Sequence, residues 1–201
     1  PKREDIQIYR AVAVLAVILY HLFPNIFIYG YLGVDIFFVI SGFVISNVVY
    51  SELSNSKFKY KIFFYNRFKR IVPSLITFII FVQVIIYFFS DHQQIYQTSL
   101  GNVYSLFFLS NLYFSQIIDY FSNDVSRNFI INLWSLSVEE QFYILFPLLV
   151  WFSGFGRQTK NGARNLFLIV GALTITSLIG FLYLYKSNQS AAYFLMPTRF
   201  W

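Results

Sequence analysis

The sequence contains no cysteine and little charge. None of its 201 residues is Cys, and only 12% are charged. The absence of Cys excludes disulfide bonds, thiolate metal sites and cysteine nucleophiles. An ordinary soluble domain has about 25% charged residues, so the low charge places the chain outside that class. The remainder is strongly apolar, with 57% hydrophobic residues, 22% aromatic residues and a mean hydropathy of +0.58.

Long apolar runs dominate the sequence. Leu166–Tyr185 carries no charge, and Ile62–Phe89 is almost unbroken apart from basic residues between 67 and 70. A charge-free apolar run of about 18 or more residues indicates a transmembrane helix. We therefore predict an all-α fold, a polytopic transmembrane helix bundle with five or six spans. The expected helices are at 7–24, 33–50, 70–89, 129–153 and 166–185, with a further one beginning at Ala191.

The positive charges predict how these helices are oriented. Lys and Arg are concentrated between 57 and 70 and again between 157 and 164. Cytoplasmic loops are enriched in these residues, so we expect both connections, and with them the N-terminus, in the cytoplasm. The net charge of +6 is therefore explained by Lys and Arg residues that orient the helices in the membrane. No nucleic-acid partner is predicted, because the sequence has no basic face or recognition motif for one, whereas membrane lipids are expected partners.

The apolar stretch NVYSLFFLSNLYF, at 102–114, is short for a span. Its length of about 13 residues is typical of re-entrant or interfacial segments. Asn102 and Asn111 suit backbone that is satisfied inside protein rather than in lipid. If the segment spanned the membrane, the basic residues at 157–164 would lie outside. We therefore predict a re-entrant segment at 101–115.

The first apolar helix carries two ionisable side chains, Arg10 and His21. Eleven residues of α-helix turn through about 1100°, so the two lie on one stripe about 16 Å apart along the axis. Ionisable groups in membrane helices usually face a cavity or the bundle interior. The alternative is that Arg10 snorkels to the inner headgroups and His21 to the outer surface.

Carboxylates are expected at the level of His21. Asp35 begins the second predicted helix, and Glu139 and Glu140 follow the start of the fourth. A carboxylate can hold an imidazole in one tautomer, which makes the other nitrogen a general base. Asp35 could instead cap its helix. Ser137-x-x-Glu140 matches a capping box, which makes Glu139 the better catalytic candidate.

Arg67 and Arg70 lie three residues apart, so they are neighbours on one helix face. Paired guanidinium groups bind phosphate bidentately. Anchoring to anionic lipid is the alternative, and the sequence does not choose between the two. Asp91 and His92 have metal-ligand chemistry but form a single pair in a polar loop, so no metal site is predicted.

Five stretches resemble, in order, the motifs of the acyltransferase 3 family, the bacterial integral-membrane O-acyltransferases typified by O-antigen acetylases. They are YRAVAVLAVILYH, GYLGVDIFFVISGFVIS, FYNRFKRIVPSL, LWSLSVEEQFYILFPLL and PTRFW. The resemblance runs from about Asp5 to the last residue. One departure is Ala11, where the family usually has Gly after the motif arginine.

The resemblance implies a function and a location. In such proteins an acyl group, usually acetyl from cytoplasmic acetyl-CoA, passes to a hydroxyl of a surface carbohydrate at the bacterial inner membrane. Lipopolysaccharide and lipid-linked glycans are acceptors of this class. The resemblance also implies that residues 1–201 are the N-terminal part of a larger membrane acyltransferase domain, with its remaining helices after 201.

The resemblance implies roles for individual residues as well. Arg10 and His21 belong to the essential motif, and Glu139 is the recurring acid. Arg67 and Arg70 are placed at the cytoplasmic face, where they hold the phosphates of CoA. These roles suggest that the acyl-pantetheine arm extends along the stripe from Arg10 to His21.

The chemistry at His21 has two versions. Oriented by Glu139 or Asp35, His21 either deprotonates the acceptor hydroxyl or takes the acyl group itself first. A membrane transporter is the main rival hypothesis, with a proton or anion relay through Arg10, His21, Asp35 and Glu139. A catalytically silent scaffold for a partner enzyme is a third.

Overall fold

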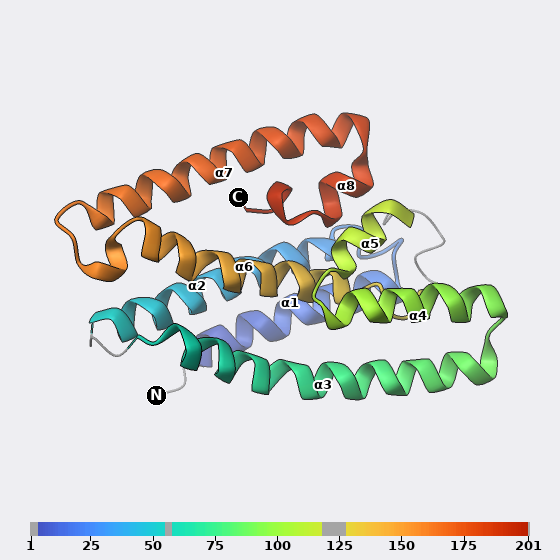
Figure 1. Ribbon diagram of the computed structural model, residues 1–201. Helices are drawn as coiled ribbons and strands as arrows, with labels where there is room; N and C mark the ends of the chain where they lie inside the picture. Colours follow the sequence, from blue (N-terminus) through green and yellow to red (C-terminus); the bar gives the residue numbers. More distant parts are fainter. Residues whose placement is uncertain (1–3, 55–57, 118–127, 201) are drawn as a thin grey trace. The chain divides into compact units, whose positions relative to one another are not determined.

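The computed structural model describes residues 4–54, 58–117 and 128–200. Within these ranges all regular secondary structure is helical (Figure 1), which confirms the predicted all-α fold. The chain divides into two compact units, Pro1–Phe58 and Lys59–Trp201, and each is described by itself.

Five helices in the described ranges are long and apolar enough to cross a membrane. Their bounds are Glu4–Leu22, Gly30–Leu53, Tyr60–Phe89, Leu133–Phe152 and Gly162–Ser187. Each overlaps one of the five predicted spans, which are thereby confirmed as helices long and apolar enough to cross a membrane. The further helix expected at Ala191 is α8 (Gln189–Phe194), whose six residues are too few to cross a bilayer.

The first unit is a hairpin of two long helices. Its elements are α1 (Glu4–Leu22), the single turn η1 (Gly30–Leu32) and α2 (Gly33–Ser54). The start of α2 lies directly against the backbone of α1, since a Cβ added at Gly33 would overlap the carbonyl oxygen of Ala13. Small residues let helices approach this closely in membranes, where association depends on packing.

Replacing Gly33 by Ala should lower the thermal stability of the purified protein, because the added methyl group overlaps the main chain of α1. Overpacking of this kind costs about 1–3 kcal/mol. Gly171→Ala in α7 is the matched control, because a Cβ there meets nothing within 4 Å and Ala favours helix. A melting temperature for Gly33→Ala at or above that of Gly171→Ala would contradict the close approach.

In the second unit, α3 (Tyr60–Phe89) begins ten residues before the predicted start at 70, so that boundary was wrong. The basic stretch around Arg67 lies inside the helix because Lys and Arg are good helix formers. Phe63, one turn earlier, is buried. With 30 residues, α3 is about 45 Å long. It exceeds a hydrocarbon core of about 30 Å, so it tilts or extends beyond it.

The next helix, α4 (His92–Leu106), turns back along the second half of α3 (Figure 1). The side-chain amide of Gln83 on α3 donates to the Ser99 hydroxyl at 3.1 Å and accepts from Asn102 at 2.8 Å. The polar stretch before 102 is therefore helical and not a loop. Asp91 begins it as N-cap, accepting the backbone N–H of Gln94 at 2.7 Å.

The next helix, α5 (Ser110–Ile117), packs against α4. The rings of Tyr104 and Tyr113 stack with centroids 5.0 Å apart. The Tyr113 hydroxyl donates to the Gln97 carbonyl at 3.0 Å, so this one residue of α5 packs along two turns of α4. The two helices thus form a helical hairpin, and a re-entrant segment at 101–115 stays a prediction.

The break between α4 and α5, at 107–109, is held by side chains of α6. Phe108 has a φ of 55°, and its carbonyl accepts the side-chain N–H of Gln141 at 2.9 Å. The backbone N–H of Ser110 donates to the Ser137 hydroxyl at 3.3 Å. Irregular backbone at membrane depth persists only where protein groups satisfy it. Two side chains of α6 meet that requirement.

α6 (Leu133–Phe152) runs antiparallel to α3. Near its end, the Pro147 carbonyl accepts from the Tyr60 hydroxyl at 3.4 Å. Further along α3, Arg67 meets Tyr143, which lies earlier along α6. α6 therefore runs in the same direction as α4, which is the arrangement expected if 101–115 does not span.

The last helices lead back along α6, and α8 packs against the first turn of α6. They are η3 (Phe155–Arg157), α7 (Gly162–Ser187), α8 and η4 (Met196–Thr198). Phe194 on α8 packs its ring 5.3 Å from Trp134 and 6.4 Å from Phe114. Arg199 caps this aromatic cluster, with its Cζ 4.3 Å from the ring centroid of Tyr193.

Single-cysteine labelling tests the helical hairpin, and the absence of native Cys makes it clean. Gln93→Cys at the start of α4 and Gln116→Cys near the end of α5 are exposed positions. Both should react with an impermeant maleimide from the same side of the membrane. Lys160→Cys, after α6, should react from the other side. Reaction of Gln93→Cys and Gln116→Cys from opposite sides would show that the segment spans.

Candidate active site

In the first unit, the predicted stripe of α1 packs against α2. Ala13 lies on the stripe between Arg10 and His21 and is buried against Gly33. Arg10 lies over the ring of Phe37, with its Cζ 5.5 Å from the centroid. Its Nε is buried and has no hydrogen-bond partner among the described residues. Arg10 therefore faces the neighbouring helix, and its unpaired donor would gain from an anionic ligand.

His21 is exposed at the end of α1. Its Nδ1 lies 2.9 Å from the Val17 carbonyl oxygen. A carbonyl can only accept a hydrogen bond, so in the neutral imidazole Nδ1 carries the proton and Nε2 keeps its lone pair. The Tyr20 ring packs edge-on, with centroids 5.4 Å apart. A main-chain carbonyl thus fixes the tautomer of His21, a role that the sequence analysis gave to a carboxylate.

Asp35 lies in the first turn of α2, two residues after its start at Gly33. It is therefore inside the helix and not at the capping position. A carboxylate in the first turn is stabilised by the helix dipole. An action of Asp35 on His21 stays a prediction.

In the second unit, a chain of contacts links Arg67 on α3 to Glu139 on α6. The Cζ of Arg67 lies 4.0 Å from the ring centroid of Tyr143, within cation–π range. The Tyr143 hydroxyl donates to Oε1 of Glu139. Tyr143 is only 3% exposed, so both contacts are shielded from solvent and correspondingly strong.

This chain of contacts differs from the predicted arrangement. The sequence placed Arg67 at the inner face of the membrane and Glu139 near the outer face. Each lies nearly two turns inside its own helix. The two helices are antiparallel, and Arg67 meets the face of the Tyr143 ring while Glu139 accepts from its hydroxyl.

Glu140 belongs to the same charge cluster. It is 8% exposed, and its Oε1 is buried with no hydrogen-bond partner among the described residues. Glu139 lies within electrostatic range of it, as do Arg67 and Arg70. Arg70 itself is exposed, one turn beyond Arg67 on α3. Two acids and two arginines are therefore gathered between α3 and α6.

The capping box predicted for Ser137 and Glu140 is wrong. α6 begins at Leu133, so both residues lie inside the helix. The Ser137 hydroxyl bonds instead to the Ser110 hydroxyl, 2.7 Å away on α5. Trp134 is already helical and only 1% exposed, because α8 packs over the first turn of α6.

Residues 3–199 match the model of a family described as an acyltransferase domain. The chain belongs to the acyltransferase 3 family. This confirms the resemblance of its five motifs. No solved structure matches the chain significantly.

Three curated relatives of the chain come from different bacteria. The O-acetyltransferase OatA of Staphylococcus aureus is 35% identical over 192 residues, covering 94% of this chain and 31% of the relative. The peptidoglycan O-acetyltransferase OatA of Listeria monocytogenes is 35% identical, covering 94% and 30%. The putative peptidoglycan O-acetyltransferase YrhL of Bacillus subtilis is 33% identical, with the same coverage. The chain spans about a third of the length of these relatives.

In this acyltransferase chain, sequence reasoning missed Tyr143. A signal for it exists, because Tyr143 lies four residues after Glu139 and the two therefore share a helix face. Its contact with Arg67 depends on how α3 and α6 are aligned, which the sequence does not show. In the described ranges, no group of three or more His, Cys, Asp or Glu side chains is placed to hold a metal.

Tyr143→Phe should separate the two contacts of this residue. The ring stays under Arg67, but Glu139 loses its hydrogen-bond donor. A hydrogen bond to a charged group is worth about 1.5–3 kcal/mol, so kcat for acyl transfer should fall roughly tenfold to a hundredfold. The KM for acyl-CoA should stay within about twofold, because Arg67 keeps its aromatic contact.

Tyr113→Phe is the control, since its hydroxyl also makes one hydrogen bond, to the Gln97 carbonyl, but on the α4–α5 hairpin. It should retain full kcat. Wild-type kcat in Tyr143→Phe, or an equal loss in both variants, would remove the positioning role of Tyr143.

Proposed function

We propose that this chain is part of a membrane O-acyltransferase. It moves an acyl group, acetyl in the first instance, from cytoplasmic acyl-CoA to a hydroxyl of a cell-envelope carbohydrate. Membership of the acyltransferase family and the names of the relatives support the reaction class. The observation that carries the mechanism is the imidazole of His21, with Nδ1 held by a main-chain carbonyl.

His21 acts as general base through Nε2. Nε2 takes the proton of the acceptor hydroxyl while that oxygen attacks the thioester carbonyl of the donor. The carbon–sulfur bond then breaks, and the CoA thiolate takes the proton back from the imidazolium. In the two-step version Nε2 attacks the thioester carbonyl, and the carbon–sulfur bond breaks to release the CoA thiolate. The acceptor oxygen then attacks the acyl carbonyl, the bond to Nε2 breaks, and the proton of the acceptor hydroxyl passes to the thiolate. Both versions need an unprotonated Nε2.

The donor is held through its phosphates by Arg67 and Arg70. Arg70 is exposed, and Arg67 lies over one face of Tyr143. In the first unit, the unpaired Nε of Arg10 is a further contact for an anionic group, and Asp35 supplies negative charge that stabilises the imidazolium. Glu139, held by Tyr143, is the candidate catalytic acid of the second unit.

The acceptor is a carbohydrate hydroxyl, and the relatives named for peptidoglycan make the cell wall the first acceptor to test. This replaces lipopolysaccharide as the working substrate. The protein lies in the bacterial cytoplasmic membrane with its N-terminus inside, as its basic connections favour. A transporter remains the rival hypothesis. The relatives of the chain are named as acetyltransferases, which favours group transfer over transport.

Replacing His21 tests this function. His21→Ala in native membranes should lower acetyl transfer from acetyl-CoA to peptidoglycan fragments by at least about a hundredfold, the usual contribution of a general base. His92→Ala is the control, because His92 is the other histidine of the chain and lies exposed at the start of α4. Transfer at the wild-type rate in His21→Ala would overturn both versions of the mechanism.

A further inference from the structure

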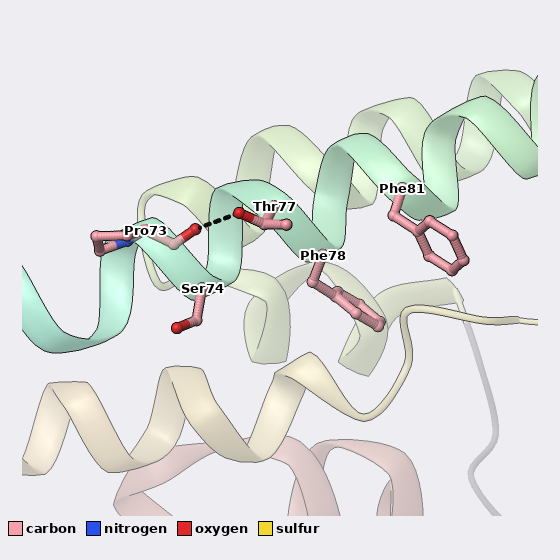
Figure 2. Close-up of a pocket in the computed structure, with 5 residues that line it drawn as sticks. All are labelled: Pro73, Ser74, Thr77, Phe78 and Phe81. Atoms are coloured by element: carbon pink, nitrogen blue, oxygen red, sulfur yellow. Dashed lines mark hydrogen bonds between the residues drawn. The ribbon is translucent and has the colours of Figure 1, made fainter.

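An open groove of about 560 Å³ runs along α3. Its lining residues are Pro73, Ser74, Thr77, Phe78 and Phe81 (Figure 2). All five come from α3, and Ser74 and Phe78 leave the helix on the same side. The groove begins one turn after Arg70, on the part of α3 that leads away from the basic stretch. The groove therefore adjoins Arg67 and Arg70, the residues proposed to bind the phosphates of the donor.

The groove is polar at one end and apolar at the other. Ser74 is an exposed hydroxyl, and the Thr77 hydroxyl donates to the Pro73 carbonyl at 2.9 Å, which leaves its lone pairs to accept. Two hydroxyl acceptors, Ser74 and Thr77, thus follow Arg70 within about two turns, and the rings of Phe78 and Phe81 come after them.

This order fits a ligand with a charged head, hydrogen-bonding groups in the middle and an apolar end. From Arg70 to Phe81 the helix rises about 16 Å. A hydrocarbon chain would leave the acceptor lone pairs of the two hydroxyls without partners, at a cost in free energy. An arm that carries amides would satisfy them, because each amide N–H donates to an oxygen acceptor.

We propose that the groove on α3 binds the pantetheine arm of the acyl donor. The phosphates lie at Arg70, and the arm's two amide N–H groups donate to the hydroxyls of Ser74 and Thr77. Its apolar groups pack on Phe78 and Phe81. The inference rests on the proposed use of CoA as donor and extends it, because the sequence assigned the arm to the α1 stripe alone.

The test compares two probes on purified protein by calorimetry. CoA carries the arm, whereas adenosine 3′,5′-bisphosphate has the phosphates and no arm. Ser74→Leu and Thr77→Leu remove acceptors and fill the groove, so each should weaken CoA binding about tenfold or more and leave the bisphosphate unchanged. Arg70→Gln should weaken both probes.

Thr176→Leu is the matched control. The Thr176 hydroxyl donates to the Ala172 carbonyl at 2.9 Å, the same bond that Thr77 makes to Pro73, but on α7. It should bind both probes like the wild type. Because Thr→Leu is made in both helices, a general effect on folding would appear in both variants.

Three results would overturn the proposal, and they are distinguishable. If Ser74→Leu and Thr77→Leu bind CoA like the wild type while Arg70→Gln does not, the arm lies elsewhere and the donor assignment stands. If the two variants lose both probes equally, the groove does not recognise the arm. If the wild-type protein binds neither probe, the proposed donor itself is wrong.

Discussion

Polar groups in an apolar medium must find their partners within the protein, and both units are organised by this constraint. The clearest case is the break at 107–109, where helix geometry ends and main-chain groups lose their helical partners. Gln141 and Ser137 replace those partners from α6. The α4–α5 hairpin and α6 therefore depend on each other, since the hairpin would otherwise bury unpaired backbone at a cost of several kcal/mol per group. The hairpin thus bonds to the residues of α6 that flank Glu139 and Glu140.

The same constraint shapes the charge cluster. Arg67 lies over the face of Tyr143, so its charge is stabilised by the ring although the residue is half-buried. The guanidinium carries five N–H donors, and a phosphate can accept from them. The Tyr143 hydroxyl donates to Glu139. One side chain therefore orients a cation with its ring face and an anion with its hydroxyl. An aromatic residue is well suited to a site that must hold both charges.

Much of the fold followed from hydropathy and length. The five spans were predictable because apolar runs of that length have few alternatives. The start of α3 was not predictable from hydropathy, since Lys and Arg end an apolar run without ending a helix. The capping box at Ser137 failed because the same pattern also occurs inside a helix. Arg67 and Glu139 could be named but not joined, because their meeting depends on the alignment of two distant helices.

The hydrogen bond from His21 to the Val17 carbonyl has an evolutionary consequence. A side-chain partner for an imidazole can be lost by a single substitution, whereas every residue type at position 17 supplies a carbonyl. The tautomer of His21 is therefore inherited with the helix itself. Neighbouring side chains are free to diverge, and with them the acceptor that the protein recognises, while the proton-accepting nitrogen stays the same.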